Sequence, residues 1–160
     1  MKFQTFQHST GSATRSSKQI GKIRGRNSTK IHLSVDSGSL PIFFDLSEGQ
    51  RHDIVHAKSL VEQLDEVNTI VCDKGYDSET LRAYIGSKGG RTVIPKRNYG
   101  QDIDKESMDW FLYKYRHLVE NAFARIKHYR SISTRYDKLE RNYASMVSLA
   151  FILMWLPMYC

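Results

Sequence analysis

The chain has 160 residues, 40% of them hydrophobic, so it is long enough to bury one core and too short for several domains. The formal net charge of +7 is concentrated at one end: residues 1–30 hold seven Lys or Arg and no acid, whereas the other 17 basic residues balance all 17 acids. The two cysteines, Cys72 and Cys160, are too few for a disulfide framework or a zinc site, which favours the cytoplasm.

Residues 1–30 form a basic arm in which nine residues are Ser or Thr and few are large and apolar. Such a composition predicts a mostly flexible segment, because little surface can be buried to offset the entropy of ordering. Positive charge without acids indicates salt-dependent binding to DNA phosphates, with Arg24 and Arg26 among the contacts. An organellar transit peptide and a solvated tail without function are the alternatives.

From Lys30 the pattern changes to that of strands. Ile31, Leu33 and Val35 alternate with polar residues, and a second run follows the turn at residues 36–41, which predicts a β-hairpin. Residues 53–64 carry apolar side chains at helical spacing, with Asp53 as a candidate cap.

The next segment, residues 68–72, is uncharged and rich in β-branched residues, as is typical of a buried strand. Asp73 follows it directly, and Asp77 or Ser78 is expected to cap a helix that reaches Lys88. Another short strand is expected at residues 91–95. The order of these elements predicts an α/β fold with a mixed sheet and helices on its faces, where functional sites gather at the carboxyl ends of strands. Asp73 is therefore a candidate catalytic residue, although aspartates at strand ends equally serve as turn formers or caps.

A long helix is expected over residues 112–127. One face of this helix is apolar within an arc of about 100° and is predicted to face the core; it consists of Leu112, Tyr115, Val119, Ala122, Phe123 and Ile126. The adjoining stripe has the spacing Y-x2-R-x3-E-x6-K and consists of Tyr113, Arg116, Glu120 and Lys127. Glu120 thus lies where core meets solvent, as metal binding or proton transfer requires. The alternative is an ordinary i,i+4 ion pair between Arg116 and Glu120, worth a few tenths of a kcal/mol.

The order and spacing of these four residue types resemble the glutamate signature of DDE-class bacterial insertion-sequence transposases, of the insertion-sequence-five type and the four-like superfamily. The segments RHLVENAF and STRYDKLERNYASMVSLAFILMWL resemble the family's C-terminal helices. The segments VCDKGYDSETLRAYI and VIPKRN resemble its second-aspartate region and the basic loop that follows. The two groups of matches stand in the family's order, with Asp73 47 residues before Glu120.

The resemblance implies an RNase H-like mixed sheet flanked by helices over residues 31–160, with long C-terminal helices. In this family three carboxylates hold two Mg²⁺ or Mn²⁺ ions for DNA cleavage and strand transfer at the ends of the element. Asp73 and Glu120 correspond to the second and third of these acids, as catalytic residues and metal ligands. The residues expected to contact DNA are Tyr113, Arg116, Lys127, Lys96 and Arg97.

The family's first aspartate precedes a segment like FQHSTGSA, and counting back places it just before Met1. We therefore expect a C-terminal catalytic portion that is truncated at its N-terminus, with residues 1–6 as the remainder of the first strand. Asp36 and Asp45 are candidates for a replacement acid. Two functions stay open: a DDE transposase that cleaves DNA, and a catalytically inactive DNA-binding remnant.

The final segment, residues 144–160, carries no charge and raises a membrane anchor as a further alternative. Its length is at the lower limit for spanning a bilayer, and a helix that packs across the sheet is expected instead. Met154, Trp155 and Met158 are expected to contact the core or a second copy of the chain. The expected partners are double-stranded DNA, at transposon ends and target, and a second copy in a homodimer; the expected location is the bacterial nucleoid.

Overall fold

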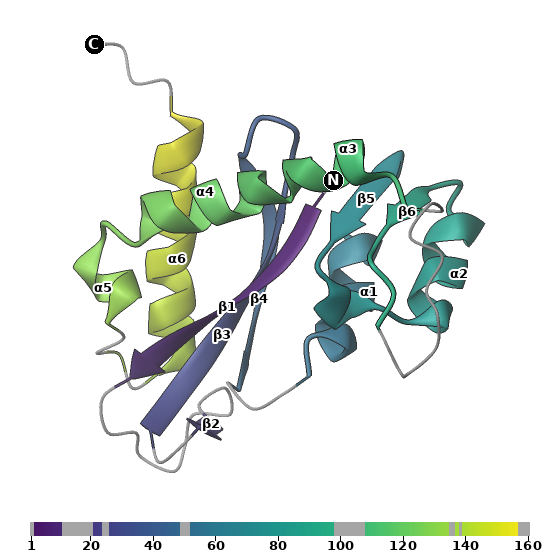
Figure 1. Ribbon diagram of the computed structural model, residues 1–160. Helices are drawn as coiled ribbons and strands as arrows, with labels where there is room; N and C mark the ends of the chain where they lie inside the picture. Colours follow the sequence, from purple (N-terminus) through teal and green to yellow (C-terminus); the bar gives the residue numbers. More distant parts are fainter. Residues whose placement is uncertain are drawn as a thin grey trace.

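The structure is a computed structural model that describes residues 2–10, 21–23, 26–48, 52–97, 108–134, 137 and 139–156, with only the backbone up to residue 28. In the described part, six strands form one mixed sheet (Figure 1). The strands are β1 (Lys2–Thr10), β2 (Gly21–Ile23), β3 (Arg26–Val35), β4 (Pro41–Glu48), β5 (Thr69–Cys72) and β6 (Arg91–Val93). Strand β3 pairs antiparallel with β1, β2 and β4, whereas β1–β5 and β5–β6 are parallel. The sheet order β2-β3-β1-β5-β6, with β4 also on β3, confirms the mixed sheet that the order of elements predicted.

The helical segments cover both faces of this sheet (Figure 1). They are α1 (Ile54–Glu62), η1 (Lys74–Tyr76), α2 (Glu79–Ser87), α3 (Trp110–Tyr113), η3 (Lys114–Arg116), α4 (His117–Ile126), α5 (Arg130–Ser133) and α6 (Glu140–Trp155). Because side chains alternate along a strand, Ile31 and Leu33 of β3 join one core cluster with α4 and α6. Ile70 and Cys72 of β5 belong to a second cluster with α1 and α2.

Strand β1 and the start of β3 lie in the segment that composition assigned to a flexible arm. Nine residue pairs join β1 to β3, from Lys2 opposite Val35 to Thr10 opposite Asn27. The backbone hydrogen bonds of this ladder do not depend on apolar side chains, which is why composition does not reveal them. The described part of residues 1–30 thus contains strands where a flexible arm was expected. The boundary expected at residue 30 between the arm and the catalytic domain falls inside β3. The first-strand assignment of residues 2–6 agrees with β1.

The predicted hairpin, helix and buried strand are confirmed as β3–β4, α1 and β5. The predicted cap positions are confirmed for Asp53 and Ser78, but neither side chain makes a capping hydrogen bond. Asp53 occupies the N-cap position of α1 without a capping hydrogen bond, and its Oδ1 instead accepts one from Lys30 Nζ at 2.8 Å. Ser78 stands at the N-cap position of α2 but its hydroxyl makes no capping bond, and the Asp77 carboxylate accepts from Arg82 and Arg97 instead.

The helix expected over residues 112–127 is broken into α3, η3 and α4. Val119, Phe123 and Ile126 are buried as predicted, but Tyr115, placed on the same core face, is 43% exposed. The reason is the 3₁₀ turn η3, which has three residues per turn and shifts the preceding side chains out of the α-helical stripe.

The final helix packs across the sheet, as predicted. Val147, Phe151 and Met154 of α6 are buried in the same cluster as β3 and β4, and Trp155 Nε1 donates to the Pro41 carbonyl at 2.8 Å. Within the described residues, no helix has the length and apolar character that a membrane crossing needs. Met158 lies outside the described residues, and the predicted contact with a second copy of the chain stays a prediction.

Candidate active site

Asp73 lies at the carboxyl end of β5, where the chain turns into η1. Its Oδ1 accepts a hydrogen bond from the Lys74 backbone N–H at 2.7 Å, and its backbone carbonyl accepts one from Tyr76 N–H at 3.0 Å. Asp73 is only partly exposed. The residue therefore forms the turn after β5, and its catalytic role stays a prediction.

Glu120 lies in the first turn of α4, on a helix held by buried Val119 and Phe123. Arg116 Nη1 is 2.7 Å from Glu120 Oε1, and the two side chains are 29% and 45% exposed. The i,i+4 pair is thus present, and solvent screening keeps its contribution to stability small. Its exposure also leaves the Glu120 carboxylate accessible to a cation.

Tyr113 connects the two carboxylates. Burial raises the pKa of Tyr113 most, the charges of Asp73 and Glu120 raise it further, and Arg116 lowers it. The effect of the Asp73 charge is larger than that of Glu120, so the Tyr113 side chain lies near the Asp73 carboxylate. The Arg116 guanidinium lies over the Tyr113 ring, 5.9 Å from its centre. The structure therefore gathers Asp73, Tyr113, Arg116 and Glu120 at one place.

The remaining predicted site residues are distributed differently. Lys127 is exposed at the C-cap of α4, about two helical turns beyond Glu120. Lys96 is exposed in the loop after β6, whereas the adjacent Arg97 binds the turn that follows Asp73. Arg24 lies outside the described residues, and of Arg26 only the backbone, at the start of β3, is described.

The two candidate replacement acids do not join the site. Asp36 Oδ1 accepts from the backbone N–H groups of Gly38 and Leu40, both at 2.8 Å, and so closes the β3–β4 turn. Asp45 is bound to His56, with Oδ2 and Nδ1 2.5 Å apart. Burial would raise the pKa of Asp45, but the hydrogen bond and the charge of His56 overcome this and hold it below its ordinary value. Neither residue is therefore available as a third metal ligand.

Asp73 and Glu120 offer carboxylate oxygens, the donors that Mg²⁺ and Mn²⁺ prefer. The charges of both carboxylates raise the pKa of Tyr113, so the two acids lie near the same side chain. Within the residues that the structure describes, no group of three His, Cys, Asp or Glu side chains could hold a metal. Metal binding by Asp73 and Glu120 stays a prediction.

Comparison with known proteins gives the family of the chain. The transposase DDE domain family matches residues 3–155. This chain belongs to that DDE transposase family. A Brucella ovis protein named for the transposase of insertion sequence element IS6501 is 35% identical over 128 residues, which is 80% of this chain and 98% of that protein. A Burkholderia cepacia protein named for the transposase of IS402 is 23% identical over 143 residues, 81% of this chain and 64% of that protein. No solved structure gives a significant match.

Membership of the DDE transposase family supports DNA transposition as the function and confirms the family resemblance of the sequence. The family is generally dependent on divalent metal ions, which agrees with the carboxylate oxygens at the candidate site.

A polar layer, a cluster of polar side chains that the sequence did not predict, lies on the face of β3 opposite to the core with α4 and α6. The His32 ring stacks on His56 with 4.4 Å between ring centres, and its Nε2 is 2.7 Å from Ser47 Oγ. His32 Nδ1 lies 3.5 Å from the hydroxyl of buried Tyr76, the last residue of η1. These residues are far apart in the sequence and have no metal-ligand spacing, so no pattern indicated that they meet. Through Tyr76, this polar layer contacts η1, the turn that follows Asp73.

The polar layer makes the stability of the transposase domain depend on pH. Burial, with a contribution from His56, lowers the pKa of His32 from 6.5 to about 4. Because the folded state takes up this proton less readily than the unfolded state, stability is present above about pH 6.5 and is lost as pH falls towards 4. We expect the free energy of unfolding to fall by about 2 kcal/mol between about pH 7 and pH 4.5 from His32 alone.

Urea titration of the wild type and of His32→Gln at the two pH values tests this expectation. Glutamine cannot be protonated there, so the variant should lose less stability on acidification. Asp45, whose pKa is already below its ordinary value of 3.8, loses its stabilising effect only below this window. An equal loss of stability in both proteins would contradict the assignment to His32.

Proposed function

We propose that this domain acts on DNA during transposition through a metal site formed by Asp73 and Glu120. The observation that supports the proposal is the position of Tyr113, which lies against Arg116, the ion-pair partner of Glu120, and whose pKa is raised by the charges of Asp73 and Glu120. The two acids come from the end of β5 and from α4, so the fold and not local sequence brings them to one hydroxyl group.

We also propose that the sheet is RNase H-like. Three antiparallel strands, β1, β3 and β4, are followed by β5 and β6, which run parallel to β1. Helix α1 connects the antiparallel part with the parallel part, and α3 and η3, which lead into α4, contact β5. This arrangement of the sheet, with acids at a strand end and on a helix, supports the proposal.

Each residue of the site has a role in the proposal. Asp73 and Glu120 would hold a divalent ion, Mg²⁺ or Mn²⁺; when bound, such an ion supplies a Lewis acid at a phosphodiester and lowers the pKa of a bound water. Tyr113 keeps its proton, because its pKa is raised above the ordinary value, and would donate its hydroxyl proton to a carboxylate or a phosphate oxygen at the site. Arg116 and Lys127 would pair with DNA phosphates.

A second candidate function is DNA binding without cleavage. It rests on the seven basic residues and no acid in residues 1–30, which would bind phosphates without a metal ion. The two candidate functions are distinguished by metal-dependent nicking of DNA, compared between the wild type and the variants Asp73→Ala and Glu120→Ala.

DNA binding itself is expected to have little sequence preference and a steep dependence on salt, since the net charge lies in residues 1–30. Deletion of this segment would remove β1, so we neutralise side chains instead. The variant carries four substitutions: Arg15→Gln, Lys18→Gln, Lys22→Gln and Arg24→Gln. In fluorescence anisotropy titrations with duplex DNA, the slope of log affinity against log salt should become shallower by roughly 3.

The control variant is Lys58→Gln with Lys88→Gln. These lysines belong to α1 and to the C-cap of α2, and they lie over the Tyr84 ring, 5.2 and 5.6 Å from its centre. The control should keep the wild-type salt slope. If the fourfold variant also keeps it, the arm does not bind phosphates.

A further inference from the structure

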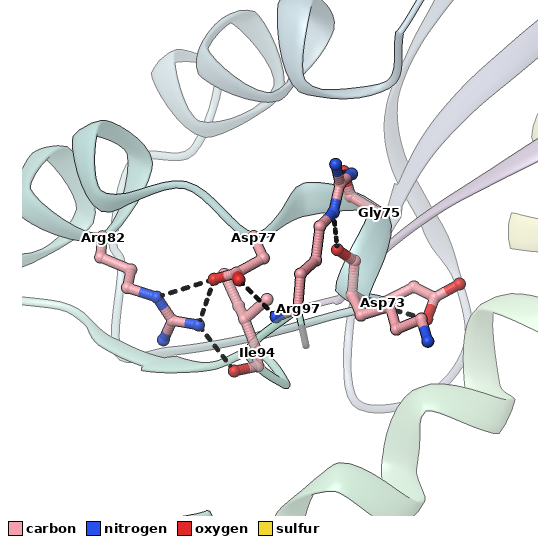
Figure 2. A network of polar contacts seen from close by, with 7 residues as sticks. Asp73, Gly75, Asp77, Arg82, Ile94 and Arg97 are labelled. Atoms are coloured by element: carbon pink, nitrogen blue, oxygen red, sulfur yellow. Dashed lines mark hydrogen bonds and ion pairs between the residues drawn. The ribbon is translucent and has the colours of Figure 1, made fainter. Parts of the chain in front are cut away.

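Arg97 binds the backbone of the turn that follows Asp73 (Figure 2). Its Nε donates to the Lys74 carbonyl at 3.0 Å and its Nη2 donates to the Gly75 carbonyl at 2.6 Å. The planar guanidinium group thus bridges two successive carbonyls of η1, which a single ammonium group cannot do with the same geometry. The sequence predicted that Arg97 contacts DNA. In the structure its side chain donates hydrogen bonds to backbone carbonyls of the protein itself.

A carboxylate holds Arg97 in this orientation. The Arg97 backbone N–H donates to Asp77 Oδ2 at 2.7 Å, and Arg82 donates to Asp77 Oδ1 through Nε and Nη2, at 3.2 and 2.7 Å. Arg82 Nη2 also donates to the Ile94 carbonyl at 2.8 Å, just beyond β6 (Figure 2). The Asp77 and Arg82 side chains are only 14% and 19% exposed, so solvent screens this pair less than a surface pair. The network ties α2, η1 and the loop after β6 together.

The opposite side of the turn is also packed. Tyr76 is fully buried, and a Cβ atom on Gly75 would lie 3.2 Å from Asp53 Oδ2, closer than most such contacts. Asp53 is in turn held by Lys30. The turn therefore has protein on one side and the Arg97 guanidinium on the other, and Asp73 is the residue where this fixed turn meets the end of β5.

We propose that Arg97 is a positioning residue for Asp73, with Asp77 and Arg82 orienting Arg97. The proposal rests on the proposed function, because it assumes that Asp73 is a metal ligand. A ligand carboxylate must be held in a fixed direction for an ion to bind, and residues that orient ligands typically change metal affinity by roughly 10- to 100-fold. Arg97 acts through the backbone of Lys74 and Gly75 and does not itself contact the ion.

The variant Arg97→Lys separates this role from DNA binding. It keeps the positive charge but loses the planar guanidinium group that donates to two carbonyls at once. We expect the dissociation constant of Mn²⁺, measured by titration calorimetry, to rise roughly 10-fold. We also expect faster hydrogen exchange of the Tyr76 and Asp77 backbone amides, which donate to carbonyls of this turn. Affinity for duplex DNA and its salt slope should stay at the wild-type values.

Lys96→Gln is the matched control, because Lys96 is the exposed neighbour of Arg97 and the substitution removes a charge. This variant should weaken DNA binding and leave Mn²⁺ affinity and amide exchange unchanged. Asp77→Asn should also weaken Mn²⁺ binding and speed amide exchange, as Arg97→Lys does, although it replaces no basic residue. Wild-type Mn²⁺ affinity and amide protection in Arg97→Lys would overturn the proposal and leave Arg97 as a phosphate contact.

The two experiments also distinguish this proposal from the proposed function. If the wild-type chain does not bind Mn²⁺, the metal site is wrong, and amide exchange alone decides whether Arg97 holds the turn. Faster exchange in Arg97→Lys would still support the positioning of Asp73, and unchanged exchange would exclude it.

Discussion

Phe123→Ala is expected to lower the free energy of unfolding by about 3–5 kcal/mol. Phe123 is 3% exposed on α4 and belongs to the core cluster that joins this helix to β3, β4 and α6. Truncation leaves a cavity that the surrounding strands and helices can fill only in part. Since domains of this size are stable by about 5–15 kcal/mol, the variant should unfold at much lower urea concentration, as followed by circular dichroism.

The matched variant on the same helix is Glu120→Gln. The Glu120 side chain is 45% exposed and paired with Arg116, so its replacement should change stability little, or raise it slightly by removing one of two neighbouring acids. The two substitutions are three residues apart and differ in burial, which makes the comparison direct. If Glu120→Gln unfolds the protein as severely as Phe123→Ala, the glutamate is structural and the proposed metal site is wrong.

Periodicity alone predicted much of the fold. The alternating residues Ile31, Leu33 and Val35 are all fully buried, and the short run before Asp73 is a strand in the sheet. These predictions succeed because a strand or helix with one buried face must repeat its apolar residues at the period of that element. The order of the elements then limits the number of topologies in which all these apolar faces are buried.

Two features of the fold could not be predicted in this way. No Gly or Pro marks the break at Lys114–Arg116, so the sequence looks like one helix and Tyr115 is placed in the core, although it is exposed. Strand β1 is rich in Gln, Thr and Ser, and it is fixed by backbone pairing with β3 and not by an apolar pattern. In both cases tertiary structure overrides a local signal.

The candidate site was predicted only in part. Spacing and family resemblance indicated Asp73, Tyr113, Arg116 and Glu120, and the structure gathers them around one hydroxyl group. The role of Arg97 was not predictable, because its acceptors are backbone carbonyls 22 and 23 residues earlier in the chain. An arginine in a basic loop looks like a phosphate contact until its partners are known.

Asp73→Ala and Glu120→Ala are each expected to abolish measurable Mn²⁺ binding. Each variant removes one of the two carboxylates that the described residues bring to the proposed site, a larger change than the roughly 100-fold loss that an orienting residue can cause. Titration calorimetry measures this directly. Asp65→Ala and Glu66→Ala are matched controls, since both acids are exposed in the connection between α1 and β5, and these variants should bind Mn²⁺ like the wild type.

Nicking of a supercoiled plasmid in the presence of Mg²⁺ or Mn²⁺ is expected to be weak, because two carboxylates cannot position two ions as three can. Asp73→Ala, Glu120→Ala and the double variant should all reduce this nicking to the level without metal. The losses should not add, since a site that needs both ligands at once fails when either one is removed. DNA affinity should remain or rise slightly in the same variants, because each removes a negative charge near the phosphates. Strong nicking that survives Asp73→Ala would instead place the catalytic acids elsewhere in the chain.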